Sequence, residues 1–250
     1  MSRLATATRM GLREQARRPL LIVLLVALPF FFITRAIAST EPLPRTIGLP
    51  GGGGEVLTNM RDIHGANMAA ITVAFLAGLV GLFIMQSARE ADRRLVVAGF
   101  RPRDLLVPRF VVLTAAVALV VVVSLAVTAL SFSPQQWWAF AAGTLLVGLI
   151  YGLIGVILGS TLGRLGATYI MLFGAMLDLG IVQNPMFGPG QPPAWGSLLP
   201  GYGPARVIVD AAFSTQFHAW GPLAVATVWL TGLALIARFA LGRVVGVAWR

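Results

Sequence analysis

The stretch from Trp137 to Leu162, WWAFAAGTLLVGLIYGLIGVILGSTL, contains no charged residue. A helix needs about 20 such residues to cross the ~30 Å hydrocarbon core of a bilayer. A segment inside lipid must satisfy its own backbone hydrogen bonds, which favours a helix over an isolated strand. Barrel strands are also shorter and alternate between apolar and polar residues. This stretch therefore predicts a transmembrane helix.

Five further apolar runs of similar length flank it on both sides. The sequence thus predicts six transmembrane helices, over residues 20–39, 66–88, 110–132, 137–162, 168–187 and 220–241. Hydrophobic residues make up 57% of the chain and charged residues 11%, whereas a soluble domain is about a quarter charged. These values exclude an ordinary globular enzyme, a disordered protein and a disulfide scaffold. We expect an all-α integral membrane protein with one six-span transmembrane domain over residues 20–250.

The arginines indicate how the helices are oriented. All 19 cationic residues are arginines, and they lie in short segments between the apolar runs rather than in one basic patch. The net charge of +10 therefore indicates membrane topology and no nucleic-acid partner. Fifteen arginines lie on one side and four on the other, namely Arg35, Arg45, Arg61 and Arg206. Cationic loops stay in the cytoplasm, so both termini are predicted to be cytoplasmic. The expected location of the protein is the inner (plasma) membrane.

The N-terminal segment, residues 1–19, is predicted to be an amphipathic interfacial helix, because Arg9, Arg13 and Arg17 share one helical face. The first apolar run also resembles a cleavable signal peptide, since small residues occur around Ala36. Arg35 beside that position argues against cleavage.

Two longer segments lie on the predicted outer side. Residues 40–65 contain three prolines and the run Gly51–Gly54, a composition typical of a flexible connector. Residues 188–219 begin with glycine and proline and become periodic between Tyr202 and Phe217, which predicts a short helix lying at or dipping into the membrane face.

The absence of lysine limits the chemistry of the chain. A P-loop needs a lysine that reaches the nucleotide phosphates, so this chain has no ATPase site of its own. It also lacks cysteine, and His64 and His218 have no carboxylate pair nearby in sequence, so we predict no catalytic residue, bound metal or cofactor. One alternative is a polytopic membrane enzyme. The segment from His218 to Gly221 matches the H-x-x-G fragment of rhomboid proteases. Those enzymes also need a G-x-S-x serine on the fourth span, which here offers Gly159-Ser160 without the G-x-S-G pattern.

Glycines in the fourth span recur every three or four residues and share one helical face: Gly148, Gly152, Gly155, Gly159 and Gly163. Small residues in this pattern let transmembrane helices approach closely. We expect them to pack within the subunit, with a dimer interface as the alternative.

The segment between the second and third spans, residues 89–109, combines six arginines with three acids and the apolar patch Leu95–Val97. A short charged helix, a Gly-Phe turn and an Arg-Pro break are predicted here. One interpretation is a cationic loop that contacts anionic lipid. Mixed charge around an apolar centre is more typical of a protein interface.

The order of these elements resembles the permease subunits of type 2 ABC exporters, which move drugs, lipids or glycans. In that family the loop between spans two and three docks on the ATPase, and an outer re-entrant element between spans five and six often begins with Leu-Pro, here Leu199-Pro200-Gly201-Tyr202. The resemblance implies these ATPase-coupling residues: Glu90, Asp92, Arg93, Arg94, Leu95, Phe100, Arg101 and Arg103.

The resemblance also implies an assembly of two permease subunits, identical or paralogous, with two copies of an ABC ATPase subunit that binds ATP and Mg²⁺. The expected function is efflux of drugs or other small amphipathic compounds. The alternatives are an intramembrane protease-like enzyme and an ATP-independent carrier.

Asp178 is the acidic residue that the sequence places deep within a span. An ionisable group at that depth costs about 2.5–3.5 kcal/mol on insertion scales, so it should face protein or water. One interpretation is a structural hydrogen-bonding partner, with Arg35 as a candidate. The other places Asp178 on the translocation path with Gln183 and Asn184, where it would bind cationic cargo.

Overall fold

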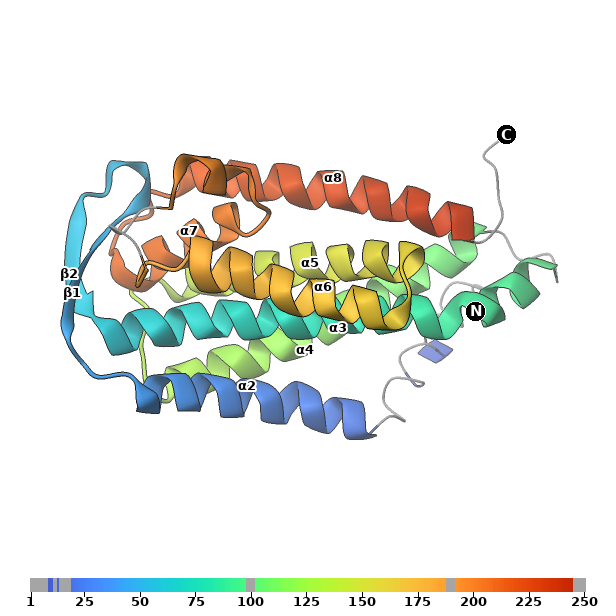
Figure 1. Cartoon of the computed structure of the whole chain (residues 1–250), viewed down its shortest axis with the longest axis horizontal. Helices are drawn as coiled ribbons and strands as arrows, with labels where there is room; N and C mark the ends of the chain where they lie inside the picture. Colours follow the sequence, from blue (N-terminus) through green and yellow to red (C-terminus); the bar gives the residue numbers. More distant parts are fainter. Residues whose placement is uncertain (1–8, 11–12, 14–18, 98–101, 188–191, 245–250) are drawn as a thin grey trace.

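The computed structural model describes residues 9–10, 13, 19–97, 102–187 and 192–244. Within these ranges six helices are long and apolar enough to cross a membrane, which confirms the all-α polytopic membrane fold. They lie side by side in one bundle (Figure 1). The spans are α2 (Pro19–Ser39), α3 (Met60–Val97), α4 (Pro102–Ala129), α5 (Trp137–Thr161), α6 (Arg164–Ala175) with its π-helical continuation η2 (Met176–Val182), and α8 (Trp220–Val244). The predicted interfacial helix over residues 1–19 falls almost entirely outside the described residues.

Helix α3 is longer than the predicted span at both ends. It begins at Met60 because Asn59 and Asp62 form a reciprocal cap. Asn59 Oδ1 accepts the Asp62 amide at 2.9 Å, and Asp62 Oδ2 accepts from Asn59 Nδ2. At the other end the helix continues through the charged segment to Val97. Alanine, leucine, glutamate and arginine are good helix formers, and no glycine occurs there before Gly99. The predicted short charged helix is thus a direct continuation of the second span.

The first inter-helical segment forms a β-hairpin, which corrects the prediction of a purely flexible connector. Strand β1 (Pro44–Gly48) pairs antiparallel with β2 (Glu55–Asn59), with the 3₁₀ turn η1 (Pro50–Gly52) between them. The glycine run makes this turn, in which Gly51 has a φ of 63° that side chains rarely adopt. Ile47 and Leu49 pack with Ile63 and Val209 in a small core of their own. We call this end of the bundle the hairpin end (Figure 1).

Between spans five and six lie the 3₁₀ helix η3 (Ala194–Leu198) and the short helix α7 (Tyr202–Phe213). The helix ends four residues before the predicted Phe217, where Ser214 takes an extended conformation. All residues from Gly203 to Ala212 are buried. The short helix is therefore enclosed by the bundle rather than lying on its surface.

The glycines of α5 line its closest approach to α3. A Cβ on Gly155 would lie 2.0 Å from the Gly78 carbonyl oxygen, and one on Gly81 would lie 2.1 Å from the Gly152 carbonyl oxygen. A Cβ on Gly159 would lie 2.9 Å from the Leu82 oxygen. A Cβ on Gly148 would meet side chains rather than backbone, 2.6 Å from Val117 Cγ1 of α4 and 3.0 Å from Val73 Cγ1 of α3. Small residues on both helices therefore bring two backbones into contact in the centre of the bundle.

The predicted orientation can be tested because the chain has no native cysteine. A single cysteine in place of Leu57, which is 72% exposed on β2, should react with an impermeant maleimide added to intact cells. A single cysteine in place of Pro102, at the start of α4, should react only after the cells are permeabilised. Labelling of the Pro102→Cys chain in intact cells would contradict the orientation.

Candidate functional site around the short helix α7

Asp178 lies on the π-helix η2, where the Gln183 amide donates to the Asp178 carbonyl five residues earlier, at 2.8 Å. Short π-helical turns occur frequently at functional sites, because they rotate side chains out of the regular helical register. The Asp178 side chain is 6% exposed and belongs to the last turns of its span, nearer the hairpin end than the predicted middle. The polar group that the sequence singles out is thus buried in protein.

Three donors surround the Asp178 carboxylate. Tyr151 Oη of α5 donates to Oδ2 at 2.6 Å, and the Gly201 amide donates to the same oxygen at 2.8 Å. Gln183 Nε2 donates to Oδ1 at 3.3 Å. These contacts replace the water that a buried carboxylate loses. Arg35, the partner considered from the sequence, is exposed on α2 and is not among the hydrogen-bond partners of Asp178.

Asp178 caps the first turn of α7. The first amides of a helix have no partner within the helix, and its N-terminal end carries a partial positive charge. The contact between Gly201 and Asp178 satisfies one such amide from a different span. Glycine at position 201 leaves room for this contact, because a Cβ there would lie 2.7 Å from both Asp178 Oδ2 and Leu179 Cδ2. The N-terminal end of the short helix is therefore fixed to span five.

The other two predicted path residues have separate contacts. Gln183 joins Asp178 to the η3 segment, since its Nε2 also donates to the Gly196 carbonyl at 2.9 Å. Asn184 makes local contacts only: its Nδ2 donates to the Gly180 carbonyl at 3.1 Å and its Oδ1 accepts the Met186 amide at 2.9 Å. The structure thus brings Asp178 and Gln183 together, and it places Asn184 two residues beyond the end of η2.

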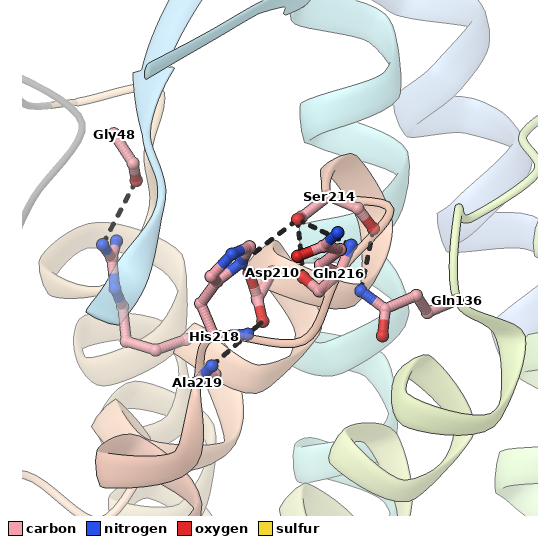
Figure 2. Close-up of polar contacts among 8 residues, drawn as sticks. Gly48, Gln136, Asp210, Ser214, Gln216, His218 and Ala219 are labelled. Carbon is pink, nitrogen blue, oxygen red and sulfur yellow. Dashed lines mark hydrogen bonds and ion pairs between the residues drawn. The ribbon is translucent and has the colours of Figure 1, made fainter. Parts of the chain in front are cut away.

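The C-terminal end of α7 is held by the link between α4 and α5. The amides of Gln135 and Gln136 donate to the carbonyls of Ala212 and Ala211 at 3.2 and 2.9 Å. Gln136 Nε2 donates to the Ser214 carbonyl at 2.8 Å (Figure 2). These are carbonyls that the end of a helix leaves unpaired. Polar partners from neighbouring spans therefore fix the short helix at both ends.

Two charged residues of α7 were missed at the sequence level. Arg206, 3% exposed, donates from Nη2 to the Gly48 carbonyl of β1 at 3.2 Å. Burial lowers the pKa of Arg206, while Tyr202 and Asp210 raise it. Asp210 Oδ2 accepts the amides of His218 and Ala219 at 2.6 and 3.0 Å just before α8 (Figure 2). The sequence did contain a signal for this site: an arginine and an aspartate lie one helical turn apart in an otherwise apolar segment.

The implied coupling residues lie at the end of the bundle opposite the hairpin. Glu90, Asp92, Arg93, Arg94 and Leu95 belong to the last turns of α3, and Arg103 to the first turn of α4. Phe100 and Arg101 lie outside the described residues. The C-terminal end of α3 and the N-terminal end of α4 thus lie together at this end of the bundle.

The serine and histidine of the protease alternative are far apart. Ser160 lies at the end of α5 away from the hairpin, and its Oγ donates to the Ile157 carbonyl at 2.6 Å. His218 lies at the hairpin end beside α7. These two residues do not form a catalytic pair. The described part of the chain also contains no group of three metal-ligating His, Cys, Asp or Glu side chains.

No protein-family model and no curated protein sequence matches this chain.

Proposed function

We propose that this chain is the transmembrane permease subunit of an ATP-driven ABC exporter that moves drugs or other small amphipathic compounds. The observation that carries the proposal is the continuation of α3 beyond its apolar part. The apolar span covers Met60–Ser87, and the helix then continues to Val97 without a break. At 1.5 Å per residue, the extension projects about 15 Å beyond the span.

The composition of this extension suits a soluble protein partner. It carries arginines and acids before the apolar patch Leu95–Val97, and Arg101, Arg103 and Asp104 follow that patch in the sequence. Interfaces likewise combine an apolar centre with a polar rim. A stiff helix that enters the bundle directly can transmit movement of such a partner to α5, with which α3 is in backbone contact at Gly78 and Gly155.

The partner must supply the energy, because a chain without lysine has no P-loop. The proposed assembly contains two permease subunits and two ABC ATPase subunits, which bind ATP and Mg²⁺. The buried helix α7 is a second supporting feature. Discontinuous short helices with the N-terminal end inside the bundle are a recurrent device of membrane transporters, and type 2 ABC exporters have a re-entrant element at this place in the chain.

The proposal predicts that the chain copurifies from its native membrane with a P-loop ATPase, and that the chain alone hydrolyses no ATP. Replacing Arg93 and Arg94 together by glutamate should reduce capture of that ATPase at least tenfold, because it reverses two charges at the interface. Capture can be measured by pull-down and mass spectrometry.

A matched control is Arg35→Glu, a charge reversal at an exposed position of α2 towards the hairpin end. It should leave capture unchanged. Undiminished capture by the Arg93/Arg94 variant, and by further disruptions across residues 90–105, would exclude this segment as the docking site. Absence of any ATPase from the native complex would favour the carrier or the membrane enzyme.

A further inference from the structure

His218 lies at the junction of three elements of the hairpin end. It follows α7 and precedes α8, and the hairpin turn packs on its backbone. A Cβ on Gly51 would lie 2.1 Å from the His218 carbonyl oxygen. The His218 side chain is 32% exposed, so protons from solvent can reach the ring. A change in the charge of this ring therefore acts where the hairpin, α7 and α8 meet.

The residue opposite His218 is Asp210, whose side chain is completely buried. Its Oδ2 accepts two backbone amides, but its Oδ1 has no hydrogen-bond partner. That oxygen lies 3.5 Å from His218 Nδ1 (Figure 2). A buried carboxylate oxygen without a donor is unfavourable, and the nearest side-chain nitrogen on the neighbouring loop is that of the imidazole.

The surroundings of Nδ1 place a proton on this atom. Ser214 Oγ lies 3.3 Å from it, but the Ser214 hydroxyl already donates to the Gln216 carbonyl at 2.6 Å. Nδ1 therefore faces two acceptor oxygens, one from Ser214 and one from Asp210. A lone pair on Nδ1 would be repelled by both. We therefore expect the neutral ring to hold its proton on Nδ1, which leaves Nε2 to bind a second proton.

We propose that His218 and Asp210 form a proton-binding site: a proton taken up at Nε2 converts their contact into an ion pair that fastens the hairpin turn, α7 and the start of α8 together. Histidine is the side chain that ordinarily changes charge roughly between pH 5 and 8. Closing the 3.5 Å gap by about 0.7 Å would give a charge-assisted hydrogen bond to the free oxygen.

The other charged groups around the ring leave this interaction in place. From α7, Arg206 is the second cation near Asp210, and its guanidinium also binds the hairpin at Gly48. The hairpin turn carries no titratable side chain before Glu55, which is exposed. The link between α4 and α5 contributes the neutral Gln136, and α8 begins with uncharged residues. Proton uptake therefore adds a cation on the side of Asp210 that lacks a donor.

The first test is the protonation state of the ring in the complete chain. The protein has only two histidines, so ¹⁵N-histidine labelling in detergent micelles gives two imidazole spectra, and His218→Gln assigns them. The expected result for neutral His218 is a proton on Nδ1. A proton on Nε2 in the neutral ring would overturn the proposal, and this reading does not depend on the folding of any variant at Asp210.

The second test is amide hydrogen exchange of the peptide that carries residues 218 and 219, whose amides bind Asp210. After correction for intrinsic pH dependence, lowering the pH from about 8 to about 5.5 should slow this exchange about fivefold, the size of a modest ion pair. His218→Gln should remove the effect. The matched control is His64→Gln, whose ring contacts Thr40 at the same end at 2.6 Å and should keep it. Equal slowing in His218→Gln would refute the proposed site.

Discussion

Replacing Gly155 by alanine is expected to destabilise the folded chain by about 3 kcal/mol or more, at the upper end of overpacking effects. The added Cβ would lie 2.0 Å from the Gly78 carbonyl oxygen and 2.8 Å from its carbon. These are backbone atoms, so no side-chain rotation can relieve the clash, and α3 and α5 must separate. Thermal unfolding of the purified protein in detergent measures the loss.

Three further glycines provide a graded control. Gly148→Ala should be milder, because its Cβ would meet the rotatable Val117 side chain. Gly174→Ala and Gly232→Ala, with no atom within 4 Å of the added Cβ, should be neutral or stabilise their helices by up to about 1 kcal/mol. If Gly155→Ala melts together with these two, the α3–α5 backbone contact is not where the structure has it.

Asp178→Leu is expected to produce a loss of comparable size, about 3–5 kcal/mol. It leaves the Tyr151 hydroxyl and the Gly201 amide buried without an acceptor, at about 1–3 kcal/mol each. It also removes the cap that holds α7. Tyr151→Phe deletes a single donor and should cost about 1 kcal/mol. Denaturation in mixed detergent compares the variants, and similar stability of Asp178→Leu and wild type would contradict the capping role.

Asp178→Asn separates the two interpretations of this residue. Its amide oxygen can still accept from Tyr151 and Gly201, so the fold should persist with a small loss. If Asp178 also binds cargo, the folded variant should export less, most strongly for cationic compounds. Unchanged export of every tested compound would exclude cargo binding by Asp178 and would support a purely structural role, the anchoring of α7.

The transmembrane helices could be predicted because length and hydropathy alone determine them. The C-terminal end of α3 could not, because the charged residues from Arg89 were predicted as a separate short helix in an inner loop. Their good helix propensity instead continues the second span to Val97. The hairpin was missed for a similar reason. Glycines that look flexible in sequence are required by the positive φ angles of the turn, and Ile47 and Leu49 supply the buried face.

Even less of the candidate site than of the fold could be predicted from the sequence. Asp178 stands out because a carboxyl group is expensive in lipid. Its partners Tyr151 and Gly201 lie 27 and 23 residues away, and their meeting depends on how α5 and α7 are rotated, which no local pattern specifies. Asp210 escaped notice because it lies in a segment interpreted as an outer connection, where an acid needs no explanation.

The pairing of Gly48 with Arg206 also sets an order of assembly during synthesis. The two residues are 158 positions apart, so at roughly 5–20 residues per second the ribosome adds the arginine about 8–30 s after the glycine. During that interval β1 and β2 have neither Val209 nor His218 to pack against. Two strands of five residues, the first opened by a proline, present little edge for other nascent chains to join. The hairpin, which can complete its packing only late in synthesis, thus has little capacity to aggregate during that interval.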